Sequence, residues 1–410
     1  MIKISEYVKN ILTMMTGAFI SQLILIAGSL AITRIYTPED LGIIALFLSI
    51  ANILTVISTV QYQHAVILPK NNNDAYNLAF YTCVIVIVFC VILTIIIYPL
   101  IDKISIFFGQ NEFELWLYWL PPMIILNAFF YIFRSWLIRV KNFKQITSAT
   151  IFKSLILNLV IIIGGIYSKD PIYFLIGNLL AQLFETFFLF GKIKRQKIIS
   201  NTKVVNKILS RYSNFPKYQL PSALVNNYTS QNPIILLNFF FGTSTIGYFA
   251  LTRRVLALPI KLIANTTKEV YKQKATEEFN RFGNCKKSFN QTFKLLFISS
   301  FVPLIILFFL SPFIFSFLFG PEWEKSGIYA RYLLIMFCLQ FSVSPLSYTL
   351  FIRDRQKYDL YWQIGLLVLT TTGILIGAYY NSADIAIICF SVAYSLMYLI
   401  YLKLIYDASR

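Results

Sequence analysis

The charged residues that could do chemistry in this chain lie inside long apolar stretches. Cations predominate there, and a single acid, Glu185, accompanies Arg134, Lys153, Arg253, Arg254, Lys261, Lys294 and Arg331. If the stretches cross a membrane, each charge costs about 2.5–3.5 kcal/mol or more at the bilayer centre unless it faces protein or water. An interior with many cations and one acid suits an anionic ligand.

Two adjacent arginines are the strongest candidates for such a ligand site. Arg253 and Arg254 lie about seven residues into an apolar stretch near 246–266. Arg254 and Lys261 are seven residues apart, which predicts one face of a continuous helix. Guanidinium forks suit phosphate oxygens in particular. We predict that at least one arginine lines a ligand cavity; the alternative is a structural pairing with Glu185 or with backbone carbonyls.

Two further intramembrane charges admit two interpretations each. Lys153 either faces the same cavity or extends to the headgroups at its end of the helix, as long cationic side chains do. Glu185 either relays a proton or a cation, or neutralises an arginine.

A run of polar residues, Asn226 to Pro233, interrupts another apolar stretch. Polar side chains cannot face lipid, and proline frees a backbone carbonyl, so we predict a bent or broken helix that lines a water-filled cavity. The residues expected to line this cavity are Gln22, at the corresponding place in the first helix, and Asn226, Asn227, Gln231 and Asn232. The alternative is hydrogen bonding between helices without a ligand.

The composition requires a membrane to position these residues. Hydrophobic residues make up 57% of the 410 residues and charged residues 13%, and the mean hydropathy is +0.67. A span needs about 20 mostly apolar residues. Twelve stretches qualify, near 11–33, 41–67, 75–100, 115–137, 147–166, 172–191, 218–240, 246–266, 289–319, 328–350, 359–379 and 384–402. The predicted fold class is an all-α polytopic membrane protein of twelve transmembrane helices.

Short motifs recur in the same order in both halves of the chain. Leu41-Gly42 returns as Ile246-Gly247, Phe108-Gly109 as Phe319-Gly320, and Ile138-Arg139 as Ile352-Arg353. Six spans per half give both halves the same orientation, so the repeats are parallel. We predict a six-helix lobe over residues 1–191, a basic cytoplasmic linker over 192–217 and a second six-helix lobe over 218–410.

The net charge of +18 reflects membrane topology. With a cytoplasmic N-terminus, the predicted outer loops carry few cations, namely Arg34, Lys103, Lys169 and Lys325, while most Lys and Arg fall on the inner side. We therefore predict that both termini are cytoplasmic and that nucleic acid is not a partner. The first apolar stretch is the length of a full span and lacks a small-residue cleavage site, so it is expected to be a helix rather than a signal peptide.

No pattern typical of an enzyme is present. The five cysteines have no metal-ligand or disulfide spacing, and no Walker A loop is found. The predicted outer loops are short, without room for a catalytic domain. We expect no catalytic residues, no metal and no cofactor.

Several motifs resemble the Wzx-type O-antigen and polysaccharide flippases of the MOP exporter superfamily. They are Thr33-Arg34-Ile35-Tyr36-Thr37-Pro38-Glu39-Asp40-Leu41-Gly42, Asn214-Phe215-Pro216 with Pro221, and Gly247-Tyr248-Phe249-Ala250-Leu251 with Arg254 and Pro259. The resemblance implies two six-helix lobes in a MATE-like V shape around a cationic cavity, in the bacterial cytoplasmic membrane. It also implies transport of an undecaprenyl-diphosphate-linked oligosaccharide, for O-antigen (lipopolysaccharide) or capsule, from the inner to the outer leaflet.

By the same resemblance, the cavity arginines correspond to Arg253 and Arg254, and Arg34 guards the outer mouth. Membrane lipids, a polysaccharide polymerase and a chain-length regulator are the implied partners. Lipid II flippases usually carry two more helices and more arginines in the first lobe, which argues against a peptidoglycan role. Two alternatives stay open: a cation-coupled multidrug exporter of the same fold, and a polysaccharide polymerase.

Overall fold

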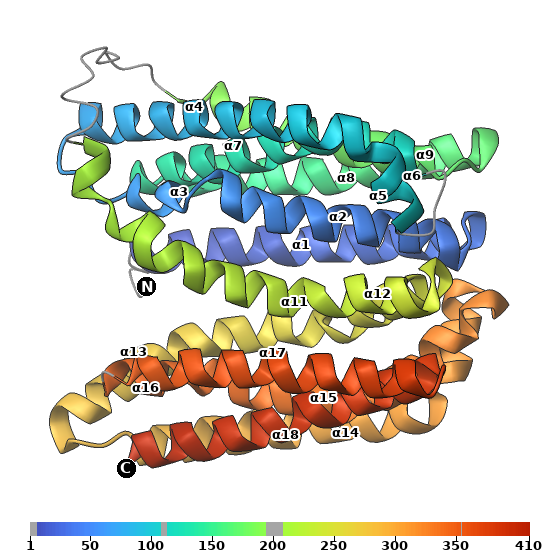
Figure 1. Cartoon of the computed structure of the whole chain (residues 1–410). Helices are drawn as coiled ribbons and strands as arrows, with labels where there is room; N and C mark the ends of the chain where they lie inside the picture. The colour runs from blue at the N-terminus through green and yellow to red at the C-terminus, as the bar shows by residue number, and fades with distance from the viewer. Residues whose placement is uncertain (1–5, 108–112, 194–207, 354) are drawn as a thin grey trace. The chain divides into compact units, whose positions relative to one another are not determined.

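The computed structural model describes residues 6–107, 113–193, 208–353 and 355–410, and this part consists of helices joined by turns, with no strand (Figure 1). The helices at the predicted spans are α1 (Glu6–Ile35), α2 (Pro38–Ser58), α4 (Asn72–Ile97), α7 (Leu120–Arg139), α8 (Phe143–Ser168), α9 (Ile172–Phe190), α11 (Leu220–Phe241), α12 (Thr243–Leu256), α14 (Lys286–Phe319), α15 (Glu324–Val343), α17 (Gln356–Tyr379) and α18 (Ala383–Ser409). The fold class is therefore all-α and polytopic.

Ten helical stretches in the described part are long and apolar enough to cross a membrane. The two that fall short of the twelve predicted are α11 and α12. Helix α11 carries the polar run from Asn226, which lowers its hydropathy. Helix α12 begins after Gly242 and ends at Leu256, so its 14 residues are fewer than the about 20 that a span needs. The full count of twelve spans stays a prediction.

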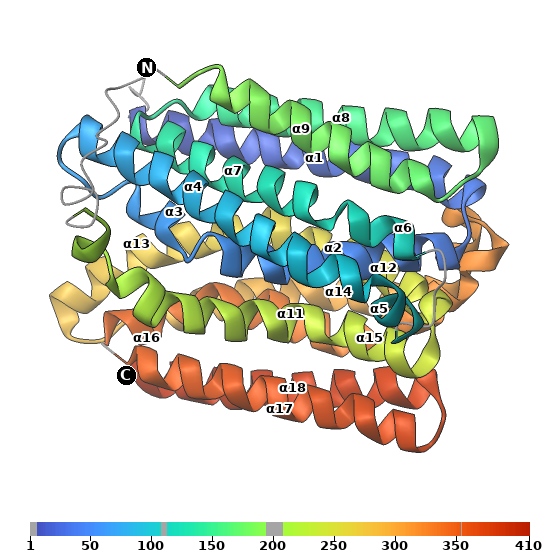
Figure 2. The ribbon, with the colours of Figure 1, turned by 45° about the horizontal axis from the view of Figure 1, so that its top comes forward.

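Contacts divide the chain into two compact units. The first contains residues 1–36 and 43–231, and the second contains residues 37–42 and 232–410. In the first unit α4 packs on α7, α7 on α9, and α8 on α9. In the second unit the corresponding pairs also pack, namely α14 with α15, α15 with α18, and α17 with α18 (Figure 2). Three helix pairings thus recur in the two units, whereas the extensive packing of α1 on α8 in the first unit has no counterpart of that extent between α11 and α17.

Shorter helices connect the long ones. They are α3 (Tyr62–Ala65), α5 (Ile101–Phe107), α6 (Phe113–Tyr118), α13 (Asn265–Phe282) and α16 (Tyr348–Ile352). Two π-helical segments, Phe215–Gln219 and Ile260–Ala264, precede α11 and α13. Side chains fix some of the helix starts: Asn71 accepts a hydrogen bond from the Asn73 amide before α4, and Ser382 accepts one from the Ile385 amide before α18.

Two arginines at equivalent places hold the turns before the third helix of each repeat. In the first unit Arg139 donates to the Ile67 carbonyl at 2.9 Å and to the Asn72 side chain at 3.1 Å. In the second unit Arg353 donates to the Gly283 carbonyl at 3.3 Å and to the Ala408 carbonyl at 3.1 Å. The motif Ile-Arg that recurs in the sequence therefore marks a recurring backbone clamp.

Two glycines allow the first turns of α2 and α12 to meet within the second unit, to which residues 37–42 belong. A Cβ on Gly42 would lie 2.0 Å from the Thr243 carbonyl oxygen, and a Cβ on Gly247 would lie 1.8 Å from the Pro38 carbonyl oxygen. These contacts are reciprocal, because Gly42 and Gly247 are equivalent in the repeat. Only glycine fits at either place.

Candidate functional site

Arg253 and Arg254, two adjacent arginines of the second unit, lie in the last turn of α12. Arg253 is half-buried with its guanidinium carbon 5.5 Å from the centre of the Phe249 ring, and Arg254 is exposed. Helix α12 is held against α15 by a 2.7 Å hydrogen bond from the Thr252 hydroxyl to the Ser326 carbonyl. Cations at a helix C-terminus are stabilised by the helix dipole, so this position suits them electrostatically.

The alignment of Arg254 with Lys261 on one helix face stays a prediction. The helix between them is interrupted, because α12 ends at Leu256 and the segment Ile260–Ala264, which follows Pro259, is a π-helix. A π-helix has a wider turn than an α-helix, so the seven-residue spacing is not by itself evidence of a shared face here. The side chain of Lys261 lies outside the described part of the structure.

The intramembrane acid of the first unit is paired with a lysine, and not with an arginine. Lys153 Nζ on α8 lies 2.8 Å from Glu185 Oε2 on α9. Thr150 Oγ1 donates to Glu185 Oε1 at 3.2 Å, and Lys153 also donates to Gln182 Oε1. The Glu185 side chain is 1% exposed, whereas that of Lys153 is 30% exposed. The ammonium also lies 5.4 Å from the Phe130 ring centre.

This cluster gives Lys153 a local role and occupies the carboxylate of Glu185. Gln182 is buried, and its Nε2 atom has no hydrogen-bond partner among the described residues. Sequence reasoning missed Gln182 and Thr150. The spacing could have found them, because each lies three residues from the charged residue of its own helix, on the same face, where it meets the charged residue of the other helix.

Helix α11 is continuous from Leu220 to Phe241 with Pro233 inside it. Of the two predicted forms, bent or broken, the broken helix is therefore wrong, and the bend stays a prediction. Asn226 is exposed, and Asn227 and Gln231 are half-buried. Asn232 is buried and donates to Thr371 Oγ1 on α17 at 2.8 Å, which is the helix-to-helix bonding of the alternative interpretation. The polar run therefore has one part that packs and one part that is exposed.

The remaining candidates are spread over the first helix. Gln22 is half-buried on α1, and Arg34 is exposed in the last turn of the same helix. Lys153 and Glu185 meet in the first unit and Arg253 and Arg254 are neighbours in the second. A cavity lined from both units stays a prediction.

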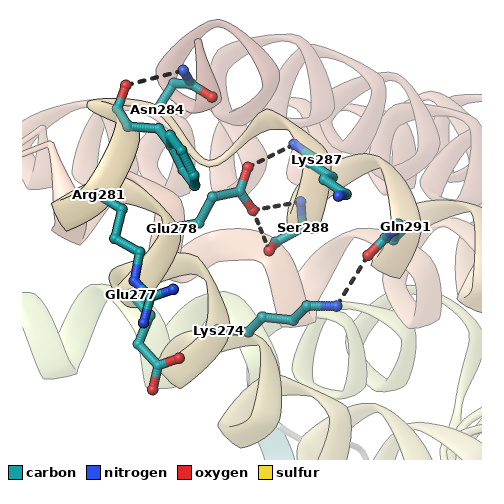
Figure 3. Close-up of a pocket in the computed structure, with 9 residues that line it drawn as sticks. Lys274, Glu277, Glu278, Arg281, Asn284, Lys287, Ser288 and Gln291 are labelled. Atoms are coloured by element: carbon teal, nitrogen blue, oxygen red, sulfur yellow. Dashed lines mark hydrogen bonds between the residues drawn. The ribbon is translucent and has the colours of Figure 1, made fainter.

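A separate cavity of about 600 Å³ lies where α13 turns into α14 (Figure 3). There the Glu278 carboxylate accepts hydrogen bonds from the Lys287 amide at 3.0 Å and the Ser288 amide at 2.8 Å. Lys274 donates to Gln291 across the hairpin at 3.0 Å. Glu278 thus caps the first turn of α14, and the cluster is structural.

Comparison with known proteins places the chain in a family. The family described as polysaccharide biosynthesis protein matches residues 31–328. The teichuronic acid biosynthesis protein TuaB of Bacillus subtilis (strain 168) is 25% identical over 159 residues, a match that covers 38% of this chain and 33% of that relative.

Two solved structures share the fold along nearly the whole chain. A multidrug resistance MATE family transporter of the MOP superfamily, in an inward-facing conformation, has a TM-score of 0.71 at 14% identity, covering 95% of this chain and 93% of that one. The lipid II flippase MurJ, in an inward closed conformation, has a TM-score of 0.76 at 17% identity, covering 95% and 86%. The chain therefore belongs to the polysaccharide biosynthesis protein family, in the fold of the MOP superfamily membrane transporters.

Proposed function

We propose that the protein is a flippase that moves oligosaccharide repeat units linked to undecaprenyl diphosphate from the inner to the outer leaflet of the bacterial cytoplasmic membrane. The observation that carries the proposal is the pairing of Glu185 with Lys153. Because this pair neutralises itself, the charges that remain farther inside the predicted spans are cations, as Arg253 and Arg254 illustrate, whereas acids such as Asp359 and Asp384 lie in the first turns of their helices. A cationic interior suits a diphosphate cargo.

The parts of the cargo would bind different groups. Arg253 and Arg254 would bind the diphosphate, with Lys261 as a further cation and Arg34 at the outer mouth. The glycan would contact the exposed polar residues of α11, and the polyprenyl tail would stay in lipid. Transport would proceed by alternating access, with both termini in the cytoplasm.

A multidrug exporter is the second candidate, because one of the structures of the same fold is a multidrug transporter. Such a protein needs an acid for cationic drugs and coupling ions. Glu185 serves poorly, since its carboxylate is buried and already bonded to Lys153 and Thr150. A polysaccharide polymerase, the third candidate, would be expected to carry a large outer catalytic loop, whereas the predicted outer loops of this chain are short.

Deleting the gene and measuring lipid-linked repeat units together with surface polysaccharide tests the proposal. We expect complete repeat units on undecaprenyl diphosphate to accumulate at the inner leaflet, and surface glycan to be lost. Normal glycan with altered drug tolerance would favour the exporter. Single unpolymerised units at the cell surface would favour the polymerase.

A further inference from the structure

A hollow of about 480 Å³ lies where the chain enters α11, and its walls belong entirely to the first unit. Its lining residues are Asn214, Phe215, Tyr218, Gln219 and Ser222. Two are carboxamides, one is a hydroxyl and two are aromatic rings, so the lining carries no charge. One charge adjoins the hollow without lining it: the Lys217 ammonium lies 5.1 Å from the centre of the Tyr218 ring.

The backbone here explains why a hollow forms. Residues Phe215–Gln219 are a π-helix with Pro216 in its first turn, and α11 begins directly after it. Single π-turns are rare in proteins and occur frequently at functional sites. Helix α3 packs against this segment, and the Tyr62 hydroxyl donates to the Leu209 carbonyl at 3.2 Å, which fixes the preceding turn.

The Tyr218 side chain is presented outward, with 62% of its surface exposed. Asn214, Gln219 and Ser222 are also exposed. Beyond the hollow, Asn226 and Ser230 continue the row at four-residue intervals from Ser222, and both are exposed. Residues at this spacing share one face of an α-helix, so a polar track leads from the hollow along α11. Such a track cannot face hydrocarbon.

The chemistry of the lining selects a neutral, polyhydroxylated ligand. Each carboxamide offers both donor and acceptor atoms, which match the hydroxyl groups of a sugar ring. Aromatic faces pack well against the apolar C–H face of a pyranose, because the ring face carries partial negative charge. A phosphate headgroup would need cationic partners, which the lining does not contain.

From this geometry we infer that the hollow at the start of α11 is a glycan subsite, in which Tyr218 stacks on one sugar of the lipid-linked oligosaccharide and Asn214, Gln219 and Ser222 bind its hydroxyls. This inference rests on the proposed function and assigns a subsite that the diphosphate cations do not supply. The track to Ser230 would hold the following sugars.

The test uses the full-length protein purified in detergent. The probe is the water-soluble oligosaccharide released by mild acid from the lipid-linked repeat units of the same cells, with binding followed by titration calorimetry. We expect Tyr218→Phe to bind like the wild type, and Tyr218→Leu and Gln219→Ala to bind about tenfold or more weakly. Phe240→Leu is the matched control, because Phe240 is also an exposed aromatic residue of α11 but lies outside both the hollow and the polar run.

Wild-type affinity in both Tyr218→Leu and Gln219→Ala would overturn the inference. Preferential binding of phosphatidylglycerol vesicles, lost in Tyr218→Leu while glycan binding persists, would overturn it as well, because the residue would then be a headgroup anchor. The proposed function fails separately, if the deletion strain makes normal surface glycan. A deletion strain that lacks glycan but is fully complemented by both variants contradicts the subsite alone.

Discussion

Lys153 and Glu185 form an ion pair between α8 and α9, with Nζ 2.8 Å from Oε2. The carboxylate is almost wholly buried, whereas the lysine keeps part of its surface exposed. A buried carboxylate that loses its cationic partner is costly. Removing Lys153 alone is therefore expected to lower the stability of the first unit.

Lys153→Gln should destabilise the protein more than the double variant Lys153→Gln/Glu185→Gln. Removing the lysine alone leaves the buried Glu185 carboxylate without its cationic partner, which should cost about 1–3 kcal/mol of stability. This cost is lower than that for a fully buried pair, because Lys153 is partly exposed. Thermal unfolding in detergent, analysed as a double-mutant cycle, measures the coupling. Additive effects of the two substitutions would contradict a structural ion pair.

Gly247→Ala should weaken the contact between the first turns of α2 and α12. A methyl group there would overlap the Pro38 carbonyl, which is backbone and cannot turn away. We expect a loss of about 1–3 kcal/mol, or a displaced helix with lost transport. The control is Gly191→Ala, since a Cβ at Gly191 meets backbone oxygens at 3.6 Å, an ordinary contact. Equal melting temperatures for both variants would argue against the close approach.

Glu278→Gln tests the cap on α14 and its pH dependence. Burial alone would raise the pKa of Glu278, but hydrogen bonds from the Ser288 side chain and from the Ser288 and Lys287 amides outweigh it and lower the pKa below its usual value. A lowered folded pKa stabilises the hairpin above the unfolded pKa of about 4.3, and this contribution is lost as the pH falls through the folded value.

At neutral pH, Glu278→Gln should therefore lower the local stability of the first turn of α14 by about 0.5–1 kcal/mol. Amide hydrogen exchange in that turn should become correspondingly faster. The difference from the wild type should shrink as the pH falls below about 4.3. Glu277→Gln is the control, because Glu277 is exposed and contacts Gln273 instead. A difference that persists unchanged in acid would contradict the cap.

The sequence predicts the helices well because each span is a local property. Its apolar length is visible without knowledge of the partners, and the recurring motifs at Gly42 and Gly247 predict equivalent positions that the packing bears out. The pairing of Lys153 with Glu185 was not predicted, since it depends on how α8 and α9 rotate against each other. The π-helix at Ile260–Ala264 was also missed, so the argument that placed Arg254 and Lys261 on one face assumed a continuous helix that the structure does not have.

Neutralising the arginines of α12 tests the diphosphate site. We expect Arg253→Gln/Arg254→Gln to abolish complementation of the deletion strain and to accumulate lipid-linked repeat units, because the cavity would lose its forked donors. Arg253→Lys/Arg254→Lys should restore only part of the activity, since lysine keeps the charge but not the planar fork.

Lys294→Gln is the control for charge, as Lys294 is an exposed cation near a helix start. The double Gln variant should still elute as a folded protein, because Arg254 is exposed and the contact between α12 and α15 runs through Thr252. Full complementation by a folded double Gln variant would remove both arginines from the site.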